Sequence, residues 1–461
     1  MEIQTSTIPE KSFADSRSQH GEATGFPWLV FVITSAITFG IQHRMDASLI
    51  WLDGGGPASQ MAQNAADGNT SREILISLLG LMGVVLLYRH RAEKLKLRGW
   101  TSLVFLCYFG WAAVSCVWAQ DPMLVVRREI AFAMILTFLF GLARSMSIDL
   151  LSLFCVAIPV CNLPIGIFAE IRNGTFHPWS GQRFGGTVHP NLQGAGLALA
   201  LLIVLWWAWR TRGKTRLPFA LAIPVLALFL FWTQSRSSMI ALVAAVVFSL
   251  VLLLVRHLAA SPARLVALAV FALAVVSLGG LLSVNSALPL APEHEIQTAR
   301  DDGDPTQLTG RVDLWQLLMT YVEARPVLGY GYDGFWTDQN IENISTDLQW
   351  SINQAHSVYI DQWLSLGVVG LTLYVALLLL ALGICTVRFL RGDDGYGYCA
   401  AVIFFVCIHN FTESINTLPT FPNFAFNLVL IHIAFLAASR PVRTNRTNPV
   451  WNAAERDTVL A

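Results

Sequence analysis

Long apolar stretches follow one another along this chain and decide what it can fold into. A bilayer-spanning helix needs about 20 mainly apolar residues, and a helix can satisfy its own backbone polar groups in lipid. The pattern predicts an all-α, polytopic integral membrane protein with about 12 transmembrane helices. The stretches lie at roughly 27–42, 73–88, 101–119, 129–146, 148–169, 192–209, 217–233, 238–255, 265–286, 358–387, 397–411 and 423–439.

The composition supports a chain that lies mainly in lipid. Of the 461 residues, 54% are hydrophobic and only 13% are charged, whereas soluble domains carry about 25% charge. Lys and Arg number 30, as do Asp and Glu, so no general attraction to nucleic acid is expected. The seven cysteines all fall in apolar stretches without a metal-binding spacing, which indicates inert packing. A soluble multidomain enzyme, a disordered chain and a secreted disulfide scaffold are therefore excluded.

The distribution of basic residues predicts the orientation in the membrane. With the N-terminus inside, twenty of the 30 Lys and Arg residues fall in inner segments and ten in outer segments. The expected organisation is a polar cytoplasmic tail at 1–26 with no cleaved signal peptide, helices one to nine over 27–286, and a large outer loop at 287–356. Helices ten to twelve then occupy 357–439, and a cytoplasmic tail fills 440–461.

The outer loop begins with the acidic tract Asp301-Asp302-Gly303-Asp304. Paired aspartates can hold a metal in a nucleotide-sugar site, but such sites need a soluble domain of alternating strands and helices. A twelve-residue calcium loop is not present either. We expect a solvated acidic loop and predict no metal site.

A predicted amphipathic helix follows in the segment TGRVDLWQLLMTYVEARP. Thr309 is its expected N-cap and Pro326 its stop. Arg311 in the first turn opposes the helix dipole unless an anion lies close by. Two interpretations of Arg311 stay open: a surface pair with Asp313 or Glu323, or a ligand-binding role. The apolar stripe, expected on or near the outer membrane surface, is Val312, Trp315, Leu318, Met319 and Val322.

Two further parts of the loop contain candidate binding residues. In VLGYGYDGFW (327–336), aromatic side chains such as Tyr332 and Trp336 could stack on sugar rings or belong to the membrane-interface belt. His356 lies where the polar sequence becomes an apolar helix. In the first turn of that helix it would be neutral and able to act as a general base, or it could serve as a capping or interface histidine.

Arg236 lies in the polar break TQSRSSM between two apolar stretches, on the outer side. The break contains no acidic residue, so its partner must come from elsewhere in the protein or from an anionic substrate. The planar guanidinium of arginine can hold two phosphate oxygens at once. Two more outer clusters have predicted supporting roles or structural hydrogen bonds: Arg183, His189 and Asn191, and the pair His409 and Glu413, which we expect on one helix face.

An ordered set of motifs resembles the superfamily of O-antigen ligases and Wzy-type polysaccharide polymerases. The similarity covers roughly 100–435 and is densest at 185–375, and the glycine-aromatic segment is most similar to the exopolysaccharide-polymerase branch. Many members have Asn after the loop histidine, whereas this chain has Ser357. The motifs are VHPN at 188–191, TQSRSS at 233–238, TGRVDLW at 309–315, RPVLGYGYDGFW at 325–336, AHSVYIDQWLSLGVVGL at 355–371 and HNFTES at 409–414.

The resemblance implies a glycosyltransferase of the bacterial inner membrane whose active face is periplasmic. Its donor would be a glycan on undecaprenyl pyrophosphate, and its acceptor a glycan or lipid A core, with no metal, nucleotide or other cofactor. The essential arginines of the family correspond to Arg236 and Arg311, and its essential histidine corresponds to His356. The predicted substrate-binding residues are Arg183, His189, Asn191, Tyr332, Trp336, His409 and Glu413.

Two alternatives remain open at this point. Within the superfamily, a ligase would transfer finished polysaccharide to lipid A core, whereas a polymerase would extend repeat units. A chain-length regulator is a further partner that the resemblance leaves open. A twelve-helix transporter or flippase is the alternative from another class. Transporters usually place charges near the bilayer midplane and contain inverted repeats, whereas here the charged candidates gather at the outer face.

Overall fold

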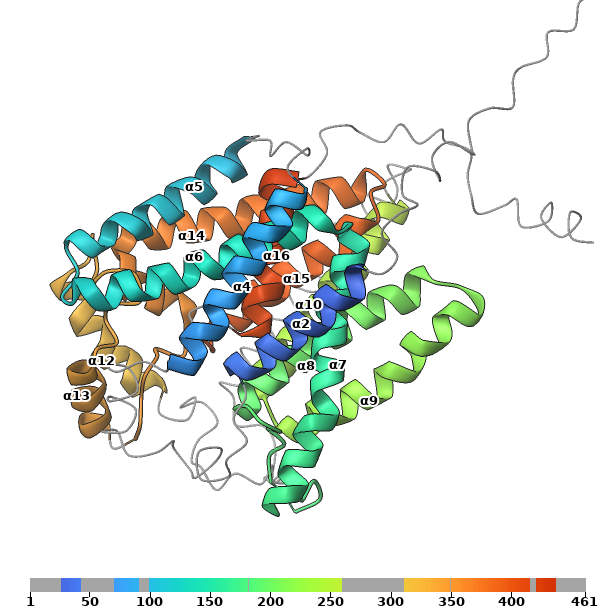
Figure 1. The fold of residues 1–461 in the computed structure, drawn as a ribbon, viewed down its shortest axis with the longest axis horizontal. Helices are drawn as coiled ribbons and strands as arrows, with labels where there is room; N and C mark the ends of the chain where they lie inside the picture. Colours follow the sequence, from blue (N-terminus) through green and yellow to red (C-terminus); the bar gives the residue numbers. More distant parts are fainter. Residues whose placement is uncertain are drawn as a thin grey trace, which may run out of the picture.

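The computed structural model describes residues 26–42, 70–90, 99–180, 182–258, 311–348, 350–414 and 420–436. Within these ranges the regular secondary structure is helical, which confirms the all-α prediction (Figure 1). The helix predicted at 265–286, the acidic tract, Thr309 and nearly all of both tails lie outside these ranges. The helices are α2 (Phe26–Gln42), α4 (Thr70–Arg89), α5 (Gly99–Val114), α6 (Pro122–Ser145), α7 (Ile148–Asn173), α8 (Pro190–Arg210), α9 (Leu217–Thr233), α10 (Arg236–Leu258), α12 (Arg311–Ala324), α13 (Asp338–Leu348), α14 (Val358–Leu390), α15 (Gly395–His409) and α16 (Phe421–Ile431).

Many of these helices are suited to a membrane. Among the described residues, seven helical segments are long and apolar enough to cross a bilayer, and three shorter apolar helices accompany them. The predicted figure of about 12 is not confirmed by this number. The seven segments are Thr70–Arg89, Gly99–Val117, Ile148–Asn173, Pro190–Arg210, Gly213–Thr233, Arg236–Leu258 and Val358–Leu390.

The apolar stretch predicted as one helix at 358–387 is broken at Gly367. This residue has φ 66° and ψ −171°, so α14 consists of two helices across a kink. The kink makes room for the outer loop: a Cβ at Gly367 would lie 1.9 Å from the carbonyl oxygen of Val327. Beyond the break, the amide of Val368 donates to the carbonyl of Pro326 at 2.9 Å. The glycine-aromatic segment therefore packs directly against the break in α14.

The described part of the outer loop forms a small core of its own. Figure 1 shows α12 and α13 together beside the ends of α5, α6 and α14. The helix predicted from the apolar stripe is confirmed as α12, and Leu318 and Val322 of that stripe are buried in this core. Val312 is exposed and Leu314 is buried instead, because α12 packs onto the other residues of this core. Those residues include Tyr330, Phe335, Trp336, Ile341, Ile344, Ile352 and Leu364.

Arg128 of α6 anchors the glycine-aromatic segment. Its guanidinium donates to the carbonyls of Asp333 and Trp336, and it lies 3.5 Å from the Asp333 carboxylate. Asp333 has a left-handed backbone with φ 54°. Burial raises the pKa of Asp333, and the charge of Arg128 acts in the opposite direction. One of the arginines that the sequence places on the outer side thus has a structural role.

Candidate functional site

Glu413 lies at the centre of a polar cluster built from five distant parts of the chain. Its Oε1 accepts a hydrogen bond from Arg311 at 2.6 Å and another from the Asn191 amide at 2.7 Å. Its Oε2 lies 3.4 Å from Nδ1 of His356. The hydroxyl of Ser237 donates to Oε1 at 3.5 Å. The structure therefore joins the beginnings of α8, α10 and α12 to the residues before α14 and after α15.

Arg311 begins the described part of α12, as predicted, but neither of its expected local partners pairs with it. Its charge is matched by Glu413, which is 102 residues away, and its other terminal nitrogen donates to the carbonyl of Thr412. The interpretation as a surface pair with Asp313 or Glu323 is therefore wrong. The anion that the helix dipole requires comes from the segment after α15. A guanidinium has five N–H donors, so this pairing leaves further donors of Arg311 for a ligand.

The electrostatics of the cluster keep Glu413 ionised. Burial of the side chain would raise its pKa, but the hydrogen bond with His356 and the charge of Arg311 outweigh burial, so the pKa of Glu413 lies well below its usual range. The side chain of Glu413 is only 6% exposed, whereas those of Arg311 and His356 are 16% and 17% exposed. The carboxylate thus lies beneath two side chains that can still be reached from outside.

His356 lies just before α14 and is therefore not in the first turn of this helix. The helix begins at Val358 with Ser357 as the N-cap, and His356 has a left-handed backbone with φ 50°. Such a conformation costs on the order of 1–3 kcal/mol in a residue other than glycine and persists only where the surroundings enforce it. Here the carbonyl of Ala355 accepts from the Trp315 indole at 2.8 Å, and the amide of Val358 donates to Asn410.

The segment before α8 supports the cluster. Arg183 donates from Nε to the carbonyl of Thr233 at 2.9 Å and from a terminal nitrogen to the side-chain oxygen of Asn191. Asn191 in turn donates to Glu413, so the structure brings Arg183 and Asn191 into the cluster. His189 serves as the N-cap of α8, where its Nδ1 accepts the amide of Asn191 at 3.2 Å.

A residue that the motifs do not single out holds this segment in place. Glu170 in α7 is buried, and one of its oxygens accepts the amides of Gly185 at 2.9 Å and Gly186 at 2.7 Å. The close approach of the backbone depends on small residues, since Gly186 has φ 66° and lies against Gly166 of α7. A carboxylate directly after an apolar stretch is the sequence signal that could have indicated this role.

Arg236 is the first residue of α10, and its neighbours bind the cluster. Ser237 contacts Glu413, and the hydroxyl of Ser238 lies 3.1 Å from Nε2 of His409. Ser235 lies 2.8 Å from Ser238 through its hydroxyl. The side chain of Arg236 is exposed. Its backbone is thus one residue from the contact with Glu413.

His409 and Glu413 are not on one helix face, because α15 ends at His409 with Asn410 as the C-cap. His409 is fully buried, stacks on Phe405 with 5.4 Å between ring centroids, and faces Ser238. Glu413 lies beyond the helix and faces Arg311 and His356. The two residues belong to one polar region but have different partners.

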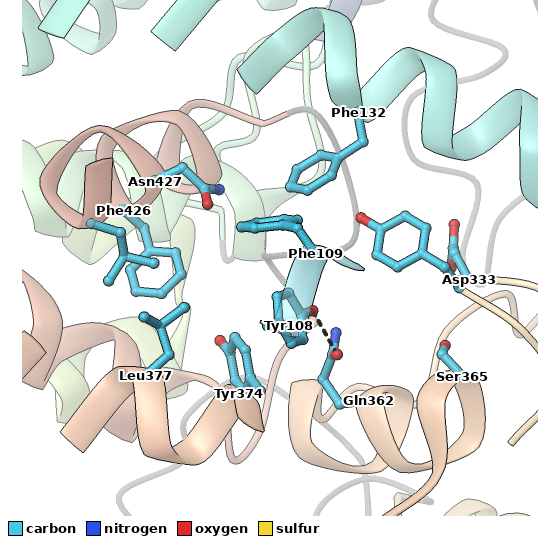
Figure 2. A pocket seen from close by; sticks show the side chains of 12 residues that line it. Tyr108, Phe109, Phe132, Asp333, Gln362, Ser365, Tyr374, Leu377, Phe426 and Asn427 are labelled. Atoms are coloured by element: carbon cyan, nitrogen blue, oxygen red, sulfur yellow. Dashed lines mark hydrogen bonds between the residues drawn. The ribbon is translucent and has the colours of Figure 1, made fainter. Parts of the chain in front are cut away.

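Tyr332 and Trp336, predicted to bind substrate, are both buried. Tyr332 stacks on Phe132 with 5.6 Å between ring centroids. It lines a cavity of about 30 Å³, room for about two water molecules but not for a sugar ring. Figure 2 shows this cavity, in which the hydroxyl of Tyr108 donates to Gln362. Trp336 donates its indole N–H to Asp361 at 2.8 Å.

Comparison with known proteins finds a family match over one continuous part of the chain. Residues 222–375 match the family described as O-antigen ligase. No curated protein matches the chain. The matched range contains Arg236, Arg311 and His356, whereas Glu413 lies beyond it. Within the described residues, no group of three or more His, Cys, Asp and Glu side chains could hold a metal ion. The match confirms, over residues 222–375, the resemblance to the superfamily of O-antigen ligases and Wzy-type polymerases seen in the motifs.

Proposed function

We propose that this protein transfers a glycan from undecaprenyl pyrophosphate to an acceptor hydroxyl at the periplasmic face of a bacterial inner membrane. The acceptor is a growing exopolysaccharide or O-antigen chain. The observation that supports this most directly is the cluster of Arg311, Glu413 and His356, which joins a cation, a carboxylate and an imidazole beside the start of α10. The proposed topology has about 12 spanning helices, both termini in the cytoplasm and residues 287–356 in the periplasm.

The arginines act on the leaving group. As the bond between the anomeric carbon and the pyrophosphate oxygen breaks, negative charge accumulates on the diphosphate. Glu413 neutralises the charge of Arg311, whereas Arg183 binds the uncharged Asn191 and Arg236 is exposed at the start of α10, so the three arginines together leave a net positive charge for this anion. Fixed donors of this kind stabilise the transition state, and removal of one commonly lowers the rate by about a hundred- to a thousandfold.

His356 acts on the acceptor. With Nδ1–H donating to Glu413, the lone pair of the imidazole lies on Nε2. Nε2 takes the proton of the acceptor hydroxyl while the acceptor oxygen forms the new bond to the anomeric carbon. The pyrophosphate leaves with the electron pair of the broken bond, so a single displacement inverts the anomeric centre. The remaining predicted substrate contacts, including Tyr332 and Trp336, would act through the loop that they stabilise.

The experiment is turnover by the purified protein in detergent, without any ion gradient. A synthetic repeat unit on undecaprenyl pyrophosphate is supplied as the donor, either alone or with lipid A core, and the products are identified by mass spectrometry. Longer lipid-linked chains support the polymerase, and a glycan on lipid A core supports the ligase. Absence of both products, together with gradient-driven movement of the donor across vesicles, would replace the proposal with a transporter.

A further inference from the structure

Asp361 in the first turns of α14 is a buried carboxylate with contacts to three separate segments. Only 1% of its surface is exposed. Its Oδ1 accepts the indole N–H of Trp336 at 2.8 Å and the amide of Ala355 at 3.1 Å. Its Oδ2 accepts the hydroxyl of Ser414. All three groups donate to Asp361, and the two oxygens of an ionised carboxylate act only as acceptors.

The positions of these donors in the chain are more informative than their number. Ala355 directly precedes His356, and Ser414 directly follows Glu413. The side chains of His356 and Glu413 meet at 3.4 Å. One carboxyl group therefore holds the two backbone segments that bring this pair together, and through Trp336 it also holds the glycine-aromatic segment.

The backbone of His356 needs such support. Its φ of 50° is uncommon for a residue with a Cβ, and neighbouring contacts must enforce it. Asp361 binds the amide on the N-terminal side of His356, and the carbonyl of Asn410 accepts the amide of Val358 on the other side at 3.0 Å. The backbone on one side of His356 is thus held by Asp361, which also binds Ser414. The backbone on the other side is held by Asn410.

We propose that Asp361 is a positioning residue for the His356–Glu413 pair, an assignment that rests on the function proposed above. It fixes the direction in which the imidazole faces the acceptor and does not touch the substrate. A misplacement of about 1 Å in a reacting group can lower a rate roughly a hundredfold. Asp361 should therefore affect the rate of the chemical step more than the binding of the donor.

The test compares Asp361→Ala and Asp361→Asn with the adjacent Gln362→Ala, in the turnover assay with the lipid-linked donor. Asn keeps an acceptor for Trp336 and Ala355, and its amide can donate to the hydroxyl of Ser414. Gln362 is also buried, but its side-chain partner is the hydroxyl of Tyr108 and not a residue next to His356 or Glu413. We expect Asp361→Ala to lower kcat about a hundredfold with KM for the donor within about threefold, and Asp361→Asn to restore most of kcat. Gln362→Ala should stay within about threefold of wild type in kcat.

A second measurement does not depend on turnover. The reaction of His356 with diethyl pyrocarbonate, followed on its peptide by mass spectrometry, should be several-fold faster in Asp361→Ala, while the exposed His177 reacts unchanged. If Asp361→Ala is not folded, Ser414→Ala removes one contact alone and should give the same two changes at smaller size. Equal kcat and equal His356 reactivity in the variants and wild type would overturn the proposal. If wild type shows no turnover but His356 is still more reactive in Asp361→Ala than in wild type, the proposed function is refuted and the positioning role stays intact.

Discussion

Nδ1 of His356 lies 3.4 Å from Oε2 of Glu413, although 57 residues separate them in the chain. The other oxygen of Glu413 binds Arg311, so one carboxylate contacts two of the three residues that the resemblance assigns to chemistry. A carboxylate on one nitrogen of an imidazole fixes which nitrogen remains free to accept a proton. Glu413 thus has the orienting role that a third residue has in a catalytic triad.

The ionisation of Glu413 gives the first prediction. Its pKa in the folded protein lies below the ordinary value of 4.5, so its stabilising contribution is complete above that pH and is lost as pH falls below it. Glu413→Gln lacks the titrating group. The unfolding temperature of wild type in detergent should therefore exceed that of the variant by a constant amount from pH 8 to about 5, and the gap should shrink at lower pH. A gap that widens in acid would contradict the sign of the shift.

Arg311→Lys should retain the charge but lose the geometry. Arg311 uses separate nitrogens for Glu413 and for the carbonyl of Thr412, whereas a lysine has one. We expect kcat for the lipid-linked donor to fall about ten- to a hundredfold. Arg325→Lys is the matched control, because Arg325 is exposed and lies over the Tyr330 ring. Full activity of Arg311→Lys would show that charge alone is sufficient.

Two glycines in α14 offer a matched pair for the kink. A Cβ at Gly367 would overlap the carbonyl of Val327, and an alanine there would have to keep the positive φ of the glycine. A Cβ at Gly383 meets no atom within 4 Å. Gly367→Ala should release the glycine-aromatic segment and lower both the unfolding temperature and activity. Gly383→Ala should leave both unchanged or slightly raise stability, since Ala favours a helix. Thermal unfolding with a turnover assay measures the difference, and equal behaviour of the two variants would be inconsistent with the kink.

The sequence predicted most of the described helices, because their signal is local. Length and apolar character suffice to place a helix at α8 or α10, without knowledge of what packs against it. The break at Gly367 could not be predicted in this way. A glycine within an apolar stretch is tolerated in a helix, and the group that requires it here, the Val327 carbonyl, comes from the outer loop.

The candidate site was predicted in its members but not in its connections. The motifs predict Arg311, His356 and Asn191. Arg311 also stands out as a basic residue in a segment predicted to be outer, where basic residues are fewer. Their common partner Glu413 could not be assigned, because Asp313 and Glu323 were nearer to Arg311 in the chain and no local pattern indicates a contact across 102 residues. Asp361 was hidden for a similar reason, since its three partners come from separate segments.

The central claim is that the imidazole of His356 performs the proton transfer of a glycosyl transfer reaction. The direct measurement is the rate at which purified protein releases undecaprenyl pyrophosphate from a lipid-linked glycan in the presence of acceptor. His356→Ala should lose activity by about a hundred- to ten-thousandfold, the range for removal of a general base. His177→Ala, in which an exposed histidine is removed, should match wild type. Equal rates for His356→Ala and His177→Ala, in protein that is folded, would contradict the account.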